Sequence, residues 1–272
     1  MEASPVKAFA VERGLAVFQP PTLRPPSALE ELAALAPEVI VVAAYGRLLP
    51  PEVLRLPLHG CLNVHPSLLP RYRGPSPVVT AMLEGEAITG VTVMLMDEGL
   101  DTGPLLAQRA VTIEERDTGE TLTRRLFEVG GRLLVETMPR WVAGELKAVP
   151  QDPSQATTTR RITKEDGQLD WGQPAARLWN RVRALDPWPG AYTLWRGRML
   201  KVLEASVAGA PGQGLPGQVF VIEGGREPRL AITAGSGTAL EVRRLQLEGR
   251  RPLEAAEFVR GQPDLVGSRL PS

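Results

Sequence analysis

With 272 residues, of which 43% are apolar and 23% charged, the chain has the size and composition of a soluble globular protein with one large or two modest domains. It contains no apolar run long enough to span a membrane and no signal peptide, so we expect a cytoplasmic protein without a membrane partner. The single cysteine, Cys61, excludes an internal disulfide, and no cluster of residues predicts a metal site.

The net charge is zero, but the charges are unevenly distributed along the chain. Residues 1–159 carry 14 lysines and arginines against 19 aspartates and glutamates, whereas residues 160–272 carry 17 basic and 12 acidic residues. Such asymmetry is typical of a chain whose second half faces a polyanion. Imbalances of this size also arise by chance, so charge alone leaves both interpretations open.

The first half of the chain has the pattern of an α/β domain. The Val-rich run Glu38–Tyr45 predicts a strand buried on both faces of a parallel sheet, and Ser27 with Glu30 predicts a capping box on the helix before it. Further strands are predicted at residues 61–64 and at Gly90–Met96. Together these segments predict a Rossmann-like, open, mostly parallel sheet.

Two helices are predicted between and after these strands. Ser76 followed by Pro77 is typical of an N-cap and a first helical position. Asp117 and Glu120 predict a second capping box. The helix behind that box has an apolar stripe formed by Leu122, Leu126, Val129 and Leu133.

The segment Ala148–Thr159 is polar, contains two prolines and lacks periodicity, which is typical of a linker. We therefore expect domains at 1–150 and 161–272, joined by 151–160. The second domain is expected to hold one amphipathic helix, with Ala175, Leu178, Trp179 and Val182 on one face. Short β-prone pieces follow, separated by turns such as Gly224–Pro228, and they predict a small OB-like β-barrel.

Asn63 and His65 alternate with apolar neighbours near the end of a predicted strand. Residues two apart in a strand share a face, and in open α/β sheets ligands bind at the carboxyl ends of the strands. An amide and an imidazolium on one face can donate to the same oxygen, as acyl transfer requires. Spacing alone favours the alternative, in which Asn63 caps a strand end and His65 is a buried structural histidine.

An acidic loop follows the strand predicted at Gly90–Met96. Asp97, Glu98 and Asp101 lie there beside glycines that allow tight turns and close approach to a ligand. A carboxylate from this loop is a candidate partner for a protonated His65. Taken alone, the loop is equally typical of a solvated acidic turn.

The motif "NVHPSLLPRYRGPSP", followed after one further strand by "MDEGLDTG", resembles the folate-dependent formyltransferases. The segments "ASPVKAFAVERGLAVFQP", "VVAAYGRLLP", "ITKEDGQLDW" and "RALDPWPGAY" resemble the members of that family that act on methionyl initiator tRNA. They occur in the same order, from near residue 4 to near residue 270. No G-x-S-x-G motif surrounds Ser67, so a serine hydrolase is not expected.

The resemblance implies transfer of a formyl group from 10-formyltetrahydrofolate to the amino group of methionyl initiator tRNA, without a metal. It places the catalytic trio on Asn63, His65 and Asp101. Asn63 and His65 would donate to the formyl oxygen or pass a proton to N10, and Asp101 would orient His65. The resemblance also implies a folate pocket lined by Arg47, Leu49, Ser67, Leu68, Leu69, Pro70, Asp97, Glu98 and Leu100.

For the basic second half, the resemblance implies a tRNA-binding domain in a monomeric enzyme. Candidate phosphate contacts are Arg160, Arg161, Lys164, Arg181, Arg183 and Lys201. Two alternatives remain open: a related enzyme with a small-molecule amine acceptor, and an inactive remnant that binds RNA or folate. The family pattern starts with a strand–helix–strand unit that is not found after Met1, which implies N-terminal truncation and an exposed edge on the Glu38–Tyr45 strand.

Overall fold

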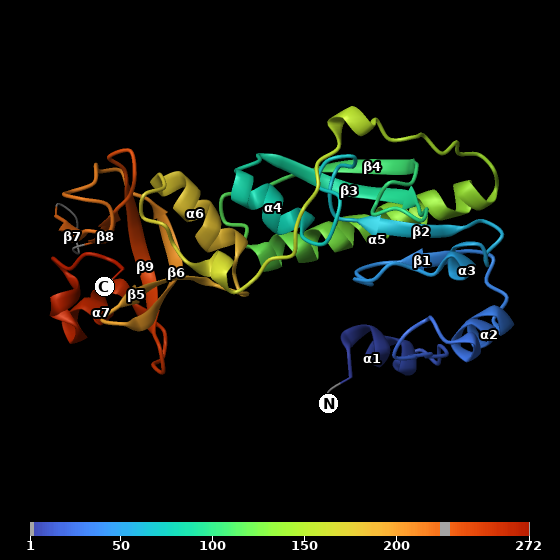
Figure 1. Cartoon of the computed structure of the whole chain (residues 1–272), viewed down its shortest axis with the longest axis horizontal. Coiled ribbons are helices and arrows are strands. Elements are labelled where there is room, and N and C mark those ends of the chain that lie inside the picture. The colour runs from blue at the N-terminus through green and yellow to red at the C-terminus, as the bar shows by residue number, and fades with distance from the viewer. Residues whose placement is uncertain (1–2, 224–228, 272) are drawn as a thin grey trace.

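The computed structural model describes residues 3–223 and 229–271, and the turn expected at Gly224–Pro228 lies outside these residues. The chain forms two lobes, each built around its own sheet (Figure 1). Within the described residues, no helix has the length and apolar character needed to cross a membrane.

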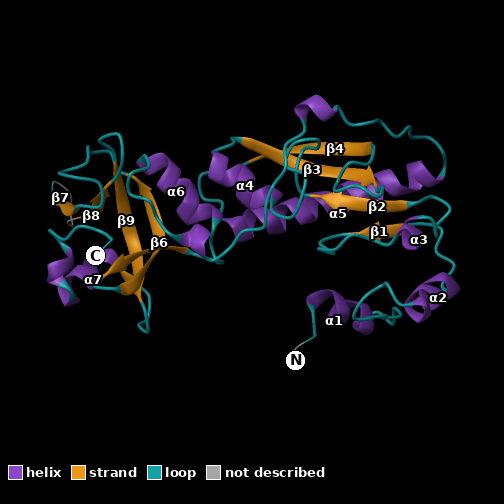
Figure 2. Cartoon of the chain, viewed as in Figure 1, coloured by secondary structure: helices purple, strands orange, loops and turns teal. Residues whose placement is uncertain are grey.

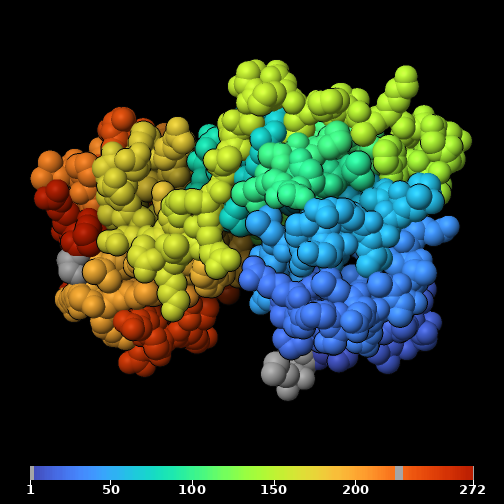
Figure 3. Space-filling view, turned by 45° about the vertical axis from the view of Figure 1, so that its right-hand side comes forward, coloured from blue at the N-terminus to red at the C-terminus, as the bar shows by residue number. Residues whose placement is uncertain are grey.

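The N-terminal segment packs beside the edge of the first sheet. Its elements are α1 (Pro5–Glu12), α2 (Pro26–Ala34), β1 (Ile40–Val42) and α3 (Pro51–Leu54). In the space-filling view, the N-terminal residues in blue lie against the lighter-blue residues that include β1 and β2 (Figure 3). The capping box predicted at Ser27 is wrong, because α2 already begins at Pro26 and has no side-chain cap. Pro26 fixes its own φ at a helical value and so moves the start of the helix.

The first sheet contains β1, β2 (Cys61–His65), β3 (Ile88–Leu95) and β4 (Leu105–Thr112), in that spatial order. Only the β1–β2 pair is parallel, whereas β2–β3 and β3–β4 are antiparallel. The expectation of a mostly parallel sheet is therefore wrong, and the sheet is mixed. The first predicted strand is also shorter than expected: β1 spans three residues at the sheet edge, and Val41 is 42% exposed.

The strand predicted at Gly90–Met96 was one of the segments from which a mostly parallel sheet was expected, but the apolar run of β3 indicates only burial on both faces. Helix α5 (Gly119–Val142) covers one face, because a Cβ on Gly130 would lie 2.6 Å from Val64 and 2.9 Å from Val91. The loop after β2 covers the other face, where a Cβ on Gly90 would lie 2.5 Å from Leu68. A strand that is buried on both faces does not show the alternation of apolar and polar residues that a half-exposed strand shows, and this holds for parallel and antiparallel strands alike.

Two helix starts were predicted in this lobe, and one is confirmed. Helix α4 (Pro77–Glu84) has Ser76 at its N-cap and Pro77 at its first position, as expected. Helix α5 instead starts from a capping box between Thr118 and Thr121. The predicted box at Asp117 and Glu120 is wrong, because the Asp117 carboxylate accepts from the Glu114 N–H at 2.7 Å and pairs with Arg125.

The linker, residues 151–160, and the residues just before it pack against the first lobe. This segment runs from the end of α5 over β4, then down across the first lobe beside α4, and on toward α6 (Figure 1). Val149 pairs with Leu105 through two backbone hydrogen bonds of 2.8 and 2.9 Å, and Thr158 pairs with Arg73. The linker also contains a 3-10 turn, η1 (Pro153–Gln155), and a second turn, η2 (Glu165–Gly167), follows it. The linker is therefore an ordered part of the first lobe's surface.

The second lobe is a sheet of antiparallel strands with two helices (Figure 2). Its strands pair in the order β5-β6-β9-β8-β7, and the short β10 pairs with β9. No pairing between β5 and β7 closes this sheet among the strands the structure describes. The elements are α6 (Ala175–Ala184), β5 (Ala191–Trp195), β6 (Arg198–Val207), β7 (Val219–Ile222), β8 (Arg229–Thr233), β9 (Ala239–Leu247), β10 (Leu253–Glu254), α7 (Ala255–Gly261) and η3 (Pro263–Leu265).

Helix α6 joins the two lobes. Its buried face carries Ala175, Leu178 and Val182, as predicted, whereas Trp179 is half-buried at the edge of the core. The helix also packs against α4 of the first lobe. A Cβ on Gly119, the first residue of α5, would lie 2.3 Å from the Ala184 carbonyl oxygen at the end of α6. The backbones of the two lobes are therefore in direct contact at this point, with no room for a side chain on Gly119.

Candidate active site

Asn63 and His65 lie on the same face of β2, as their spacing predicts. They stand opposite Met94 and Thr92 of the antiparallel neighbour β3, and residues directly opposite share a face. This face is turned away from α5, which packs against the alternate residue Val64. His65 is 4% exposed. The strand therefore projects an amide and an imidazole together toward the loop side of the sheet.

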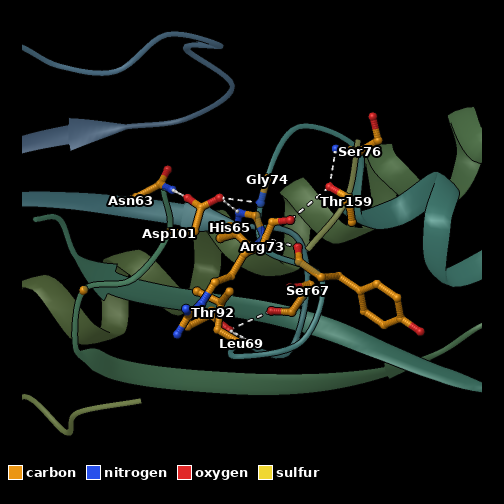
Figure 4. Close-up of polar contacts among 12 residues, drawn as sticks. Asn63, His65, Ser67, Leu69, Arg73, Gly74, Ser76, Thr92, Asp101 and Thr159 are labelled. Atoms are coloured by element: carbon orange, nitrogen blue, oxygen red, sulfur yellow. Dashed lines mark hydrogen bonds and ion pairs between the residues drawn. The ribbon is translucent and has the colours of Figure 1, made fainter. Parts of the chain in front are cut away.

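Asp101 brings a carboxylate to these two side chains from the loop between β3 and β4 (Figure 4). Its Oδ1 accepts from Asn63 Nδ2 at 3.3 Å, and its Oδ2 lies 3.7 Å from His65 Nδ1. The Gly74 N–H donates to the same Oδ2 at 2.8 Å. The structure thus brings the predicted trio together, with a backbone donor as a fourth member.

The proton on His65 is assigned by its second contact. His65 Nε2 lies 2.9 Å from the Tyr72 carbonyl oxygen, which can only accept, so Nε2 carries a hydrogen. Nδ1 is therefore the nitrogen that faces Asp101 and can gain or lose a proton. A histidine held in one orientation by a carbonyl, with its other nitrogen facing a carboxylate, is suited to proton transfer.

Tyr72 is anchored at its other end by two carboxylates. Its hydroxyl lies 2.8 Å from a Glu84 oxygen and 2.7 Å from a Glu86 oxygen, and Arg71 pairs with Glu86. Burial and the two glutamates raise the pKa of Tyr72, while the hydrogen bonds from Tyr72 and Arg71 lower the pKa of Glu86. Tyr72 has φ near 60°, a conformation that L residues rarely adopt, so these contacts help hold its carbonyl toward His65.

The residues predicted to line a folate pocket fall into two groups. Ser67 and Leu69 are buried in the loop after β2, where the Ser67 hydroxyl donates to the Arg71 carbonyl at 2.7 Å. Thr92 of β3 fixes this loop by donating to the Ser67 carbonyl at 2.6 Å and accepting from the Leu69 N–H at 3.1 Å. Leu68 and Pro70 are partly buried. This group shapes the loop beside the trio.

The second group lies on exposed segments. Asp97 accepts from the Gly99 N–H and the Thr102 hydroxyl, which closes the exposed turn that ends at Asp101. Leu100 is 51% exposed, and Glu98 forms a surface ion pair with Arg55. Arg47 is exposed and donates to the Pro21 carbonyl, whereas Leu49 is buried beside Cys61. Only the Asp97–Leu100 turn directly adjoins the trio.

Among the predicted tRNA contacts, Arg183 is the most engaged within the protein. It stacks over Trp179 at 3.8 Å and donates to the Glu114 and Glu115 carbonyls, each at 3.1 Å, across the junction of the lobes. Burial lowers the pKa of Arg183. Its contacts make it a structural residue of the domain junction.

The remaining candidates are more accessible. Arg160 pairs with Asp166 and thereby lowers the pKa of that carboxyl to about 2. Arg181 donates to the Asp166 carbonyl and, like Lys201 on β6, is partly buried. Arg161 and Lys164 are exposed on the segment after the linker. Of these side chains, Arg160 and Arg181 line the cavity at the junction of the lobes described next.

A cavity of about 560 Å³ lies at that junction. It is formed by α4, the end of the linker and α6. Thr159 lines it and also donates to the Arg73 carbonyl at 3.0 Å, next to the Gly74 that binds Asp101. Its charged lining residues are Glu84, Arg160, Asp170, Arg177 and Arg181. The loop that contains Arg73 and Gly74 therefore contacts both Thr159 of the cavity wall and Asp101 of the trio.

Sequence reasoning missed the groups that hold the trio in place. The Gly74 N–H and the Tyr72 carbonyl are backbone groups, which no side-chain pattern indicates. Gln151 was assigned to the linker, yet it donates to the carbonyls of Asp101 and Gly103 at 2.8 and 2.7 Å. Cys61 is buried, and burial raises its pKa to about 11, so it remains a thiol at neutral pH. No cluster of three or more potential metal ligands occurs in residues 3–223 and 229–271.

Gly103 is a position where the Asp101 loop tolerates no side chain. A Cβ there would lie 1.9 Å from the Leu95 carbonyl oxygen, which belongs to β3 and cannot move aside freely. Gly103→Ala is expected to destabilise the protein by about 1–3 kcal/mol and to lower kcat by displacing Asp101. Urea unfolding and steady-state kinetics measure the two effects. Gly131→Ala, in α5 with open space around its Cβ, is the control, and equal behaviour of the two variants would contradict the prediction.

Two domain families match the chain. The formyl transferase family matches residues 1–138, and the formyl transferase C-terminal domain family matches residues 161–263. Methionyl-tRNA formyltransferase of Chloroflexus aurantiacus is 48% identical over 94% of this chain and 82% of its own length. The enzyme of the same name from Anaeromyxobacter dehalogenans strain 2CP-C is 49% identical over 94% of this chain and 81% of its own length.

Solved structures extend the likeness to the fold. HypX from Aquifex aeolicus, solved in complex with tetrahydrofolic acid, superposes with a TM-score of 0.64 at 24% identity, covering 86% of this chain and 41% of that one. At this identity the likeness supports the fold alone. The identity to the sequence relatives is far higher and extends over both domains, and on that basis the chain belongs to the methionyl-tRNA formyltransferase family.

Proposed function

We propose that this protein transfers the formyl group of 10-formyltetrahydrofolate to the amino group of methionyl initiator tRNA, in the cytoplasm, for translation initiation. The observation that carries the proposal is the convergence of Asn63, His65 and Asp101 at one point, in a chain of this family. An amide donor and a titratable imidazole next to a carboxylate are the groups that acyl transfer to an amine requires.

In the proposed reaction, the amine nitrogen forms a bond to the formyl carbon, and the bond from that carbon to N10 breaks. The amine loses a proton, and N10 gains one. Asn63 Nδ2 has two hydrogens and directs one to Asp101, so the second is available for the oxygen of the tetrahedral intermediate. Such a donor is worth about 2.7–4 kcal/mol in acyl-transfer enzymes.

His65 Nδ1 is the atom that can donate to the same oxygen or deliver a proton to N10, because Nε2 is held by the Tyr72 carbonyl. Asp101 orients this face of the site: it binds Asn63, accepts from Gly74 and faces the imidazole. In the proposed transfer, Asn63 thus stabilises the oxyanion, His65 donates to the same oxygen or protonates N10, and Asp101 orients both side chains.

The formyl donor is proposed to bind beside the trio. Leu100, half-exposed next to Asp101, offers an apolar surface to a flat ring, and the turn that starts at Asp97 is closed by its own hydrogen bonds. We propose that this turn and the loop from Ser67 to Pro70 form the walls of the folate pocket, with Arg47, Leu49 and Glu98 as outlying members. The donor is a substrate, and no metal takes part in the proposed reaction.

The acceptor is proposed to approach at the junction of the lobes, where the cavity wall adjoins the Gly74 loop. The excess of basic residues after residue 159 supports a phosphate-rich partner. We propose that the antiparallel sheet of the second lobe is the OB-like tRNA-binding domain and that the enzyme acts as a monomer. Arg160, Arg161, Lys164, Arg181 and Lys201 are the proposed phosphate contacts, and Arg183 supports the junction.

The test is formyl transfer by this chain from 10-formyltetrahydrofolate to methionyl initiator tRNA, with methionine and an amino sugar nucleotide as alternative acceptors. Transfer to the tRNA alone is expected. Raising salt from 50 to 200 mM should increase KM for tRNA by about 40-fold if three phosphates are neutralised, with little change in KM for the formyl donor. Transfer to a small amine in place of the tRNA would overturn the acceptor assignment.

A pair of lysine variants sharpens the test. Lys164→Ala is expected to raise KM for tRNA and to reduce its salt dependence by about one unit of slope, because an exposed lysine contacts phosphate as a point charge. Lys147→Ala is the control, because Lys147 is exposed and follows the end of α5 at Val142, and that end of the helix points away from the second lobe (Figure 1). Equal effects of the two variants would contradict the proposed location of the tRNA.

A further inference from the structure

Gln151 lies in the linker, yet it is the residue that connects the two loops of the candidate active site. Its Nε2 donates to the Asp101 carbonyl at 2.8 Å and to the Gly103 carbonyl at 2.7 Å. Its Oε1 accepts from Arg73 Nε at 3.0 Å and from a terminal Arg73 nitrogen at 2.7 Å. Both amide hydrogens and both oxygen lone pairs are therefore used, which fixes the orientation of the side chain.

The chain on both sides of Gln151 is held against the first lobe. Two residues before it, Val149 pairs with Leu105 at the start of β4. After it, the Thr157 hydroxyl accepts from the Tyr72 N–H at 2.8 Å, and the Thr159 N–H donates to the Arg73 carbonyl at 2.7 Å. The backbone on both sides of Gln151 is thus hydrogen-bonded to the first lobe, and this fixes the position of Gln151 beside the loops that carry Asp101 and Gly74.

Asp101 needs such support because its backbone is strained. Its φ is 53°, in the left-handed region, which is unfavourable for a residue with a side chain. Conformations of this kind persist only where the surroundings hold them. In the described structure, the Asp101 carbonyl is held by Gln151 and its carboxylate by Asn63 and Gly74.

These contacts form a closed ring. It runs from Asp101 Oδ2 to the Gly74 N–H, along the backbone to Arg73, through the Arg73 guanidinium to Gln151, and back to the Asp101 carbonyl. Opening the ring at Gln151 removes the side-chain bridge between the backbone carbonyls of the Asp101 loop and Arg73 in the loop that carries Gly74. The carboxylate would then lose its fixed distance to His65 Nδ1.

We propose that Gln151 is a positioning residue for the reaction, which acts by holding Asp101 in register with Asn63 and His65. The inference rests on the formyl transfer proposed above. It assigns the linker a part in the chemistry, in addition to joining the two domains. Gln151 itself touches no reacting atom.

The first test is the kinetics of Gln151→Ala in the full chain. We expect kcat to fall about 10- to 100-fold while KM for 10-formyltetrahydrofolate stays within about twofold, because a displacement of about 1 Å in a catalytic group has effects of this size. Gln155→Ala is the matched control, since Gln155 is exposed and its amide donates to the exposed Asp152, so its loss should leave kcat unchanged. Unchanged kcat in Gln151→Ala, or a loss confined to KM, would overturn the proposal.

The second test separates positioning from general stabilisation of the linker. If Gln151 acts through Asp101, Gln151→Ala should cost less than about twofold in an Asp101→Asn background, measured in single-turnover reactions with enzyme in excess. Equal losses in both backgrounds would show that Gln151 acts independently of Asp101, which contradicts the proposal.

The third test does not depend on activity. The Gly74 amide hydrogen is bonded to the Asp101 carboxylate, so its exchange with solvent reports whether the carboxylate stays in place. Gln151→Ala should accelerate exchange at Gly74 by roughly fivefold, with no such change in Gln155→Ala. If the unaltered chain transferred no formyl group but this acceleration were observed, the function would fail while the positioning role would stand. Unchanged exchange would overturn the positioning role.

Discussion

Asp101→Asn is expected to lower kcat for formyl transfer about 1,000-fold, the scale on which acid–base groups and oxyanion donors act. The carboxylate now accepts from Asn63 on one oxygen and from Gly74 on the other. An asparagine has one acceptor oxygen, so its amide must face either the Asn63 amide or the Gly74 N–H. In either orientation a donor faces a donor, and the imidazole loses the negative charge beside Nδ1.

The variant is expected to remain folded, because asparagine has the same shape and keeps one of the two hydrogen bonds. Single-turnover kinetics and thermal melting measure activity and folding separately. Asp264→Asn, in an exposed ion pair with Arg196 on the second lobe, is the control for the substitution itself. An Asp101→Asn enzyme that retains more than about a tenth of kcat would remove Asp101 from the mechanism.

His65→Gln is the second substitution for which a large effect is expected, a loss of about 100- to 1,000-fold in kcat. Glutamine can still donate through its amide to the Tyr72 carbonyl, which His65 now satisfies at 2.9 Å. It cannot provide a titratable nitrogen in place of Nδ1. The substitution therefore removes proton transfer while leaving the buried carbonyl paired, which avoids a penalty of about 1–3 kcal/mol for an unsatisfied group.

His59→Gln provides the comparison, since His59 contacts its surroundings through its backbone: its N–H donates to Glu38, and its carbonyl accepts from Trp141. We expect this variant to keep full activity and His65→Gln to keep a melting temperature within a few degrees of the unaltered protein. Equal kcat in the two variants would show that the imidazole of His65 has no chemical role.

Sequence patterns predicted the site well wherever a side chain repeated with the period of its element. The alternation of Asn63 and His65 along β2 predicted their shared face, and the structure confirms it. The short β-prone pieces expected in the second domain form strands, among them β5 and β9. In each case one local property, the alternation or run of side chains, decides the outcome.

The predictions that failed depend on contacts between distant parts of the chain. The apolar run in β3 indicated burial correctly, but strand direction is decided by how β2 and β3 meet after α4, which no run of residues encodes. The spacing of Ser27 and Glu30 matched a capping box, yet Pro26 had already started the helix. The contacts of Gln151 within the linker were not predicted, because the carbonyls to which it donates lie 48 and 50 residues earlier in the chain and Arg73 lies 78 residues earlier.

The anchored linker has a consequence for exchanging parts between members of this family. The two domain matches leave residues 139–160 unassigned, so a chimaera joined anywhere between them respects the sequence families equally well. The hydrogen bonds place the boundary after Thr159, because Gln151 and Thr159 are hydrogen-bonded to the loops around Asp101 and Gly74 of the first lobe. A first domain combined with a foreign second domain should therefore keep its own chain through Thr159, because a junction placed earlier would separate the loops around Asp101 and Gly74 from the backbone to which they are hydrogen-bonded.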